Sequence, residues 1–324
     1  MQVVVLGAGS LGSLYAAWSA DAGHDVCVVS RPAHAQAVNS DGLVVCGRGA
    51  PPRTFRIRAV SNVADAPDAD VVVLASKGPD TTELLDGYRG NPTAAWSVQN
   101  GVRHCETLVR RFGEAALGSV SMVGATLTGP GVVDHTFDGG TYIGALSSSD
   151  PHSVDAVVSS LSGDAGVIVR DDIESVTWSK AVLAAAAMGS SMLLRLPYHH
   201  MFTEPGARET FYRIVADAAA VAEAEGAALV DLPGPLQAGS LMSLPRDQAL
   251  DALADVGAAM VASGQTSVRV SMLQSLDSGR RLEVAAVFGD LIELADRHHL
   301  AVPVLRTVAD VVATLDDVAG RSVR

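Results

Sequence analysis

The first half of the chain alternates short apolar runs with segments of helical spacing. Gln2–Leu6 and Asp70–Ala75 are almost wholly apolar, as expected for strands buried on both faces of a parallel sheet. Helical spacing follows the first run at Ser10–Ala22, and Gly23 ends it. Strands that alternate with helices form βαβ units, so the pattern predicts an α/β domain with a Rossmann-type doubly wound parallel sheet.

The remaining elements of this half are predicted from weaker patterns. A hairpin is expected from Val132–Phe137 and Thr141–Ile143, because Asp138-Gly139-Gly140 separates them. Further strands are expected at His24–Ser30, Val44–Cys46, Phe55–Val60, Thr93–Val98, Leu117–Val123 and Val167–Val169, and helices at Thr81–Tyr88, Cys105–Phe112 and Val154–Leu161.

Strand patterns cease near Arg170 and helical periods replace them. Helices are predicted at Ser175–Leu194, Pro205–Glu225, Gln248–Ala262, Gly279–His298 and Val304–Val318. A length of 324 residues suits two domains. We therefore expect a sheet domain at residues 1–170 and an all-helical domain at residues 171–324, with the active site in the cleft between them.

Charge and composition restrict the kinds of molecule that the protein is expected to bind. The formal net charge is −13, with 23 basic and 36 acidic residues, so the chain is a poor ligand for nucleic acid or an anionic membrane. No apolar run reaches the roughly 18 residues that a membrane span needs. A small-molecule partner is expected, and the apolar helical domain is compatible with a homodimer.

The cysteines and histidines do not form a metal-binding pattern. Three cysteines without metal-like spacing, and no secretory signal, favour free thiols and a cytoplasmic location. The adjacent pairs His199-His200 and His298-His299 lack a carboxylate at ligand spacing, so no metal is expected.

A glycine-rich motif opens the first predicted helix. Gly7-Ala8-Gly9-Ser10-Leu11-Gly12 is a GxGxxG sequence directly after a strand. Gly7 permits the tight turn, Gly9 lets a pyrophosphate approach the backbone, and Gly12 lets helix and strand pack closely. The helix N-terminus then offers free N–H groups to the anion, which predicts dinucleotide binding.

The end of the second strand favours NADP(H) over NAD. An acidic residue there would bind the ribose 2′-hydroxyl, but the strand ends in Ser30-Arg31. Arg31 can form a forked contact with a 2′-phosphate and Ser30 can add a hydroxyl group, whereas Asp25 lies too early in the strand.

Five further positions carry polar chemistry. Lys77 and Asn100 each follow a predicted strand, at the sheet edge where doubly wound folds bind ligands. Lys180 lies in the first long helix of the second half beside the apolar run Ala181–Met188, and Ser271 and Glu283 follow later in that half.

The order and spacing of these motifs resemble the ketopantoate reductase (2-dehydropantoate 2-reductase) family over essentially the whole chain. The likeness rests on the GxGxxG motif, Arg31, Ser76-Lys77-Gly78, Gln99-Asn100-Gly101, Trp178-Ser179-Lys180, Ser271–Gln274 with Glu283, and the sequence HHLAVP at residues 298–303.

The resemblance implies an NADP-dependent oxidoreductase that reduces ketopantoate to pantoate. It implies that Lys180 is catalytic and Glu283 its acidic partner. It also implies that Asn100 lies by the nicotinamide ribose and substrate, that Ser271 binds the substrate carboxylate, and that Arg31 and Lys77 bind the 2′-phosphate end.

The chemistry of a lysine fits that role. Hydride transfer to a ketone places negative charge on oxygen, which an ammonium group can stabilise and protonate. Each residue also has an ordinary explanation: a surface lysine at 180, a helical i,i+3 pair of Glu283 with Arg280, a turn residue at Asn100, a loop lysine at 77, and an N-cap at Ser271.

The chain departs from the family where the substrate is held. Where the family has two asparagines after the lysine, this chain has Ala184 and Met188. Gly189 replaces a proline expected next, and Leu282 replaces a threonine expected before the glutamate. Lost hydrogen-bonding groups remove selectivity for a polar ligand. We therefore expect a less polar ketone, 2-keto acid or imine in a specialised pathway.

Three alternatives remain open at this point. One is an imine reductase, and another is a 3-hydroxyacid or opine-type dehydrogenase on the same scaffold. The third is a non-catalytic NADPH-binding sensor.

Overall fold

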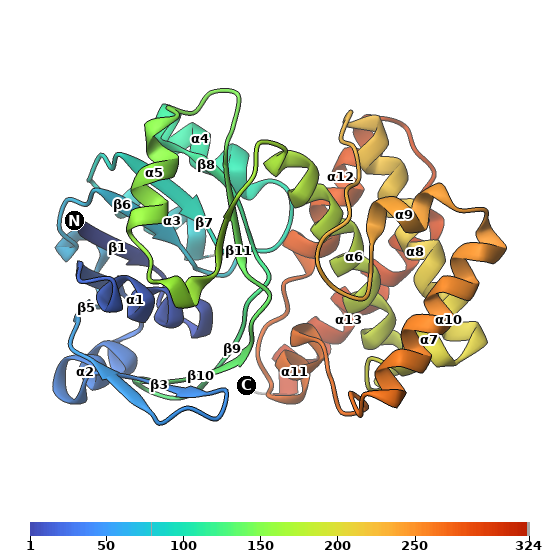
Figure 1. The fold of residues 1–324 in the computed structure, drawn as a ribbon, viewed down its shortest axis with the longest axis horizontal. Coiled ribbons are helices and arrows are strands. Elements are labelled where there is room, and N and C mark those ends of the chain that lie inside the picture. The colour runs from blue at the N-terminus through green and yellow to red at the C-terminus, as the bar shows by residue number, and fades with distance from the viewer. Residues whose placement is uncertain (79, 323–324) are drawn as a thin grey trace. The chain divides into compact units, whose positions relative to one another are not determined.

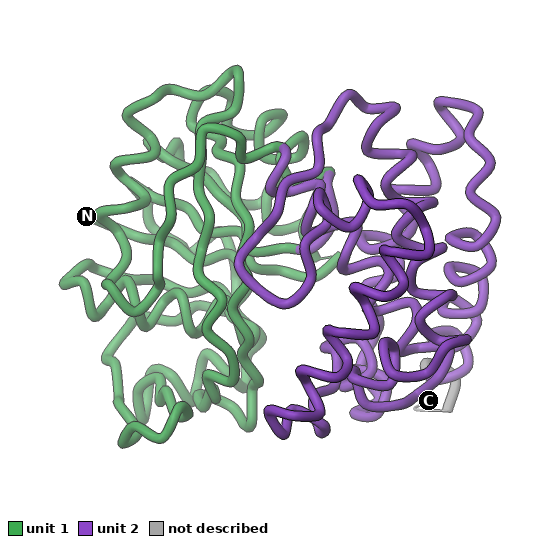
Figure 2. Tube along the Cα trace, turned by 45° about the vertical axis from the view of Figure 1, so that its right-hand side comes forward, with its two compact units in different colours: residues 1–99, 103–174 green, residues 100–102, 175–324 purple. Residues whose placement is uncertain are grey.

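The structure, a computed structural model, describes residues 1–78 and 80–322 of the chain. They divide into two compact units, which comprise residues 1–99 and 103–174 in the first and residues 100–102 and 175–324 in the second (Figure 2). The helical segment therefore shares its unit with a tripeptide, Asn100-Gly101-Val102, that is remote from it in sequence.

Five parallel strands form the central sheet of the first unit, in the order β5-β2-β1-β6-β7 (Figure 1). They are β1 (Gln2–Leu6), β2 (Asp25–Val29), β5 (Arg58–Val60), β6 (Val71–Leu74) and β7 (Ala94–Ser97). With β1 and its two neighbours at the centre, this is the Rossmann-type sheet that the sequence predicts.

Both faces of the sheet are buried, which explains its uninterrupted apolar runs. Along β1, Val3 and Val5 pack into one core cluster while Val4 and Leu6 pack into another. The helices of this unit are α1 (Ser10–Asp21), α2 (Pro32–Asp41), α3 (Asp80–Gly87), α4 (His104–Phe112) and α5 (His152–Ser159).

Two smaller sheets complete the first unit, and they correct two predictions. The orders are β4-β3-β10-β9 and β12-β11-β8. The strands are β3 (Leu43–Gly47), β4 (Arg53–Phe55), β8 (Leu117–Ser121), β9 (Gly124–Gly129), β10 (Val132–Phe137), β11 (Thr141–Ala145) and β12 (Val167–Val169).

The hairpin predicted between the segments now called β10 and β11 is wrong. β10 pairs antiparallel with β9, an unpredicted strand, and β11 pairs with β8 and β12 in another sheet. The predicted strand Phe55–Val60 is also wrong, because its ends belong to β4 and β5 in different sheets.

The second unit is helical, and the described chain contains no strand after β12. Its helices are α6 (Ile173–Leu194), α7 (His200–Thr203), α8 (Pro205–Ala224), α9 (Ala238–Ser243), α10 (Arg246–Ala262), α11 (Ser271–Asp277), α12 (Asp290–Arg297) and α13 (Pro303–Ser322). No helix in the described ranges is both long and apolar enough to cross a membrane.

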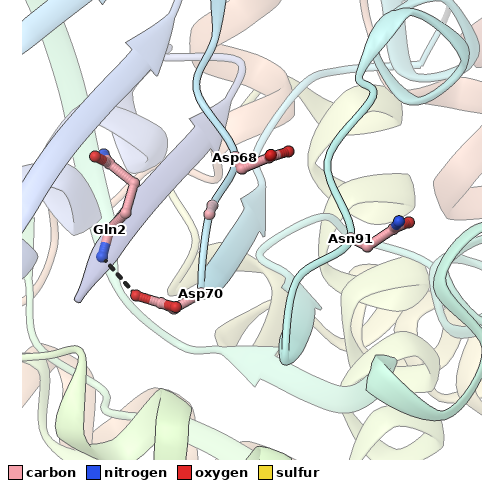
Figure 3. A pocket seen from close by; sticks show the side chains of 5 residues that line it. Gln2, Asp68, Asp70 and Asn91 are labelled. Carbon is pink, nitrogen blue, oxygen red and sulfur yellow. Dashed lines mark hydrogen bonds between the residues drawn. The ribbon is translucent and has the colours of Figure 1, made fainter.

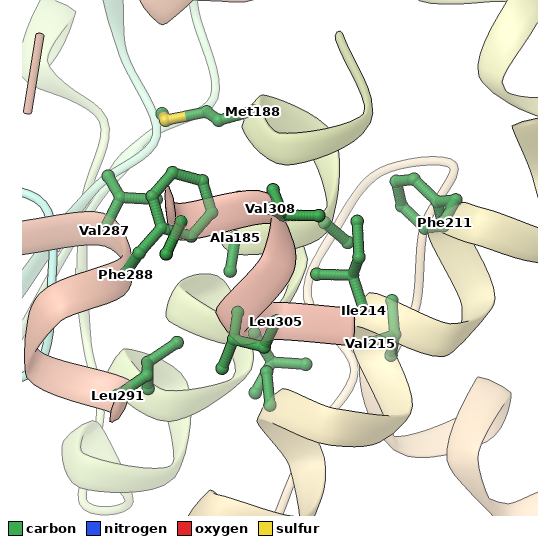
Figure 4. Packing of buried hydrophobic residues seen from close by; sticks show 14 of the residues in the cluster. Ala185, Met188, Phe211, Ile214, Val215, Val287, Phe288, Leu291, Leu305 and Val308 are labelled. Carbon is green, nitrogen blue, oxygen red and sulfur yellow. The ribbon is translucent and has the colours of Figure 1, made fainter. Parts of the chain in front are cut away.

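Helix α6 is apolar nearly all round because the other helices cover it. Ala185 of α6, Ile214 of α8 and Val308 of α13 belong to one buried cluster (Figure 4). A Cβ atom at Gly189 would lie 2.8 Å from Cγ1 of Val308, so α6 and α13 approach too closely there for a larger residue.

The helix predicted over Gly279–His298 begins later than the sequence pattern indicates. Residues up to Glu283 form a loop, followed by a π-helical turn at Ala285–Gly289 and then α12. Such turns occur frequently at functional sites.

Candidate active site

Lys180 is the one lysine in residues 175–324. It lies in α6 and is half-buried. The preceding residue, Ser179, is buried and holds the surroundings in place. Its hydroxyl donates to the carbonyl oxygen of Ser175 at 2.7 Å and accepts the N–H of Val230 at 2.8 Å. The lysine thus projects from a fixed segment of backbone.

The surroundings of Lys180 bring its ionisation close to neutral pH. Desolvation lowers the pKa of its ammonium from the ordinary 10.5 to about 8, and the negative charge of Glu283 opposes that fall. A lysine with such a pKa is mostly charged at pH 7 and can still release its proton readily.

Asn100 and Glu283 meet in the same unit although 183 residues separate them in sequence. The side-chain amide of Asn100 donates to Oε2 of Glu283 at 3.5 Å. The structure therefore brings together three of the predicted site residues, Asn100, Lys180 and Glu283. The alternative helical pair of Glu283 with Arg280 is wrong, because neither residue lies in a helix.

Gly101 explains how the Asn100 turn fits against the π-helical turn. Its φ is +93°, and a Cβ atom there would lie 2.5 Å from the carbonyl oxygen of Ala286. Only glycine accepts both the backbone angle and that close approach. The asparagine is thereby held beside the loop that carries the glutamate.

The two apolar residues that stand where the family has asparagines lie on α6 after Lys180. Ala184 and Met188 follow it by one and two helical turns, so the three residues share one side of the helix. Met188 is 8% exposed and belongs to the apolar core (Figure 4). Ala184 packs against that core. This side of α6 offers no hydrogen bond to a ligand at either position.

Ser271 is exposed at the first position of α11. The N-cap of that helix is Val270, so the alternative N-cap role of Ser271 is wrong. Its role in substrate binding stays a prediction.

The three glycines of the GxGxxG motif are each required for a different reason. Gly7 has φ +100°, and a Cβ atom there would lie 2.6 Å from the backbone nitrogen of Ser76. At Gly12 a Cβ atom would collide with the carbonyl oxygen of Gly7. At Gly9, which is exposed, it would meet nothing within 4 Å. The open space at Gly9 is where a pyrophosphate needs to approach.

The N-terminus of α1 offers backbone N–H groups that can bind an anion. Its N-cap, Gly9, makes no side-chain cap, and the backbone N–H groups of Ser10, Leu11 and Gly12 precede the first intrahelical bond, from Ser13 to Gly9. Ala8 instead bonds through its N–H to Val29 at 2.9 Å, which fixes the loop to β2. These residues fit a dinucleotide phosphate.

Ser30 and Arg31 lie directly after β2, as the sequence indicates. The hydroxyl oxygen of Ser30 is buried and has no hydrogen-bond partner in the described chain. The Arg31 side chain is 90% exposed, and its guanidinium lies 3.7 Å from the carboxylate of Asp80. Lys77 is exposed in the loop after β6. An unpartnered hydroxyl and an exposed arginine fit a 2′-phosphate.

Two side chains that support the loops of the candidate cofactor site were not predicted from the sequence. Buried His34 accepts the N–H of Gly131 at Nδ1 (3.0 Å), and its Nε2 lies 3.2 Å from the hydroxyl of Ser13 in α1. Gln99 donates to Ser76 at 2.8 Å and to Thr81 at 2.7 Å. His34 lies in no recognisable motif, and the Gln99-Asn100-Gly101 motif by itself assigns the glutamine no role.

A hollow at the opposite edge of the central sheet is not part of this site. It is lined by Gln2, Asp68, Ala69, Asp70 and Asn91, at the amino ends of β1 and β6 (Figure 3). One of its carboxylates, that of Asp70, already accepts the N–H of Gln2 at 2.8 Å. In the described residues no group of three or more potential ligands could hold a metal ion.

Comparison with known proteins covers both units. Residues 3–148 match the family described as ketopantoate reductase PanE/ApbA, and residues 172–316 match the C-terminal domain of the same family. The 2-dehydropantoate 2-reductase of Halobacterium salinarum is 29% identical over 317 residues, covering 96% of this chain and 98% of that protein.

Solved structures share the fold. A PanE/ApbA family ketopantoate reductase from Ralstonia eutropha has a TM-score of 0.79 at 25% identity, covering 98% of this chain and 99% of its own. D-mandelate dehydrogenase with NADH and anilino(oxo)acetate has a TM-score of 0.82 at 18% identity, covering 98% and 99%. With both units matched in sequence and in fold, the chain belongs to the ketopantoate reductase family, whose members are oxidoreductases that act on a keto group.

Proposed function

We propose that this protein uses NADPH to reduce a ketone or 2-keto acid that is less polar than ketopantoate. The observation that carries the proposal is Lys180, half-buried in an apolar helix, with a pKa of about 8 and an acidic partner in Glu283. The protein would then be a reductase of the family's general type with an altered substrate.

Lys180 acts as the proton donor in this proposal. Its ammonium stabilises the negative charge that develops on the carbonyl oxygen and then transfers a proton to that oxygen. Glu283 keeps the ammonium charged and oriented, and Asn100 holds the carboxylate of Glu283 while offering polar contacts to the substrate. The hydride itself is the contribution of a bound reduced nicotinamide dinucleotide.

The cofactor preference rests on the end of β2. Ser30 and Arg31 would hold the 2′-phosphate, Lys77 would add positive charge, and Gly7 to Gly12 would hold the pyrophosphate. The fold alone does not decide between cofactors, since the mandelate dehydrogenase of the same fold is named as holding NADH. The absence of an acidic residue directly after β2 favours NADPH.

The substrate preference rests on α6. Ala184 and Met188 present a methyl group and a thioether where hydrogen-bonding amides are expected from the family. A polar substrate would lose hydrogen bonds there, whereas an apolar side chain would gain contact. We therefore expect bulkier aliphatic or aromatic 2-keto acids to react faster than ketopantoate.

Turnover measurements test this proposal directly. Oxidation of NADPH is followed with ketopantoate, with apolar 2-keto acids, with simple ketones and with cyclic imines. We expect turnover of an apolar 2-keto acid, and a loss of roughly 10²- to 10⁴-fold in the Lys180→Ala variant. Preference for ketopantoate by orders of magnitude would refute the altered substrate, and tight NADPH binding without any turnover would indicate a sensor.

A second measurement tests the cofactor. Arg31→Ala should raise the KM for NADPH by about tenfold or more, because a charged hydrogen bond to phosphate contributes roughly 1.5–3 kcal/mol. The KM for NADH, which has no 2′-phosphate, should stay within about twofold. Equal effects on both cofactors would show that Arg31 does not contact the 2′-phosphate.

A further inference from the structure

Glu283 lies in a loop, so something other than helical hydrogen bonding has to fix its position. The loop runs from the end of α11 to the π-helical turn. On its C-terminal side the Glu283 carbonyl oxygen accepts the N–H of Val287 at 3.0 Å, which ties the residue to that turn. The N-terminal side of the loop needs a second anchor.

A buried carboxylate on α13 supplies that anchor. Asp316 is 6% exposed. Its Oδ1 accepts the backbone N–H of Leu282 at 2.9 Å, and its Oδ2 lies 2.8 Å from Nη2 of Arg281. Both oxygens therefore bind consecutive residues that directly precede Glu283. A buried carboxylate is costly unless it is satisfied in this way.

The helix that carries Asp316 is itself held by the core of this unit. Leu305 and Val308 of α13 are buried in the same cluster as Phe288 of the π-helical turn (Figure 4). Arg281 is 72% exposed at its side chain, so the charged contact lies at the surface while the contact with the Leu282 N–H is interior. One rigid helix thus holds both sides of the Glu283 loop.

We propose that Asp316 is a positioning residue for catalysis, which clamps the backbone before Glu283 and so holds that carboxylate toward Lys180. The proposal rests on the proposed function, in which the pair of Lys180 and Glu283 is catalytic. Without the clamp the loop gains freedom and the Glu283 carboxylate spends less time beside the ammonium. The lysine then loses part of the interaction that keeps it charged.

The composition of the chain makes this measurable without turnover. Only two residues are lysines, Lys77 and Lys180. Protein labelled with ¹³C at the lysine Cε therefore gives two lysine signals, and Lys77→Arg assigns them. The chemical shift of the Lys180 signal, followed against pH, gives the titration midpoint of its amine directly.

Asp316→Ala should lower the titration midpoint of Lys180, and Glu283→Gln should lower it further. The double variant should titrate like Glu283→Gln alone, because the clamp acts only through that carboxylate. Asp316→Asn retains an oxygen acceptor for the Leu282 N–H and should restore most of the midpoint. Asp317→Ala, an equal change of charge at an exposed neighbour, should leave the midpoint where it is.

Activity gives a second readout. With an accepted substrate, Asp316→Ala should lower kcat by roughly 10- to 100-fold and change KM for NADPH little. An unchanged Lys180 midpoint in folded Asp316→Ala would overturn the proposal, as would an equal shift in the Glu283→Gln background. If Asp316→Ala does not fold, Asp316→Leu, which fills a similar space without an oxygen acceptor, carries the same test. A wild-type protein that reduces no carbonyl compound refutes the proposed function, while the NMR titration still decides the role of Asp316.

Discussion

At the scale of single residues, the positions at which the chain has lysine instead of arginine bear on the mechanism. Of the 23 basic residues only Lys77 and Lys180 are lysines, and both lie at positions that the family resemblance assigns to the site. Arginine serves every other basic position. An arginine cannot act as a proton donor near neutral pH, whereas a desolvated lysine can. A lysine rather than an arginine at position 180 is therefore consistent with the proton donor of the proposed function.

The pH profile follows from the same residue. In the proposed function the charged form of Lys180 is the proton donor, so kcat/KM should fall as pH rises through about 8, the pKa of this amine. Lys180→Arg stays charged across this range, so it should be slower yet lose the alkaline fall. Steady-state kinetics from pH 6 to about 10, with a buffer control for cofactor stability, make the comparison. An alkaline fall that persists in Lys180→Arg would assign it to another group.

At the scale of elements, substitutions in the GxGxxG loop and helix α1 should separate effects on folding stability from effects on cofactor binding. Gly12→Ala places a methyl group against the Gly7 carbonyl oxygen and 3.0 Å from the Cβ of Ala75. Overpacking of this kind costs about 1–3 kcal/mol, which exceeds the roughly 1 kcal/mol gained from helix propensity. Thermal unfolding should therefore show a lower Tm for this variant.

Gly9→Ala is the matched control, because a methyl group there meets nothing within 4 Å. Its Tm should stay close to that of the wild type, while its Kd for NADPH rises because the methyl group occupies the space of the pyrophosphate. The outcome that contradicts this interpretation is a Tm loss in Gly9→Ala with unchanged cofactor binding.

Elements with strong local patterns could be predicted, and those fixed by distant contacts could not. The buried strands β1 and β6 and helix α6 are apparent from apolar runs and helical periods. The pairing of β10 with β3 depends on a partner far away in sequence. β9 directly precedes β10 and pairs with it, but its sequence GATLTG has no strong apolar pattern, so the hairpin was wrongly expected with β11. The loop before Glu283 has helical spacing, yet the clamp from Asp316 holds Arg281 and Leu282 outside a helix.

The candidate site shows the same division. Motifs with their own chemistry, such as GxGxxG and the lysine in an apolar helix, were visible in the sequence. Asp316, Gln99 and His34 act through hydrogen bonds to backbone or side chains that only the folded chain brings near, so no sequence pattern predicts these roles.

At the scale of the whole molecule, the two units are not separated by a single boundary in the sequence. Gln99 belongs to the sheet unit, where it bonds to Ser76 and Thr81, and the next residue, Asn100, belongs to the helical unit, where it bonds to Glu283. The chain changes unit at that peptide bond, returns at Arg103, and changes again after Glu174.

Because the chain enters the helical unit twice, the exchange of parts between such proteins during evolution is constrained. A single recombination event near residue 174 would give the helical unit a tripeptide at 100–102 from a different ancestor. Gly101 would then have to fit a foreign π-helical turn, and Asn100 a foreign glutamate loop. Inheritance of a new substrate preference through the helical unit therefore requires that three residues embedded in the other half of the gene travel with it.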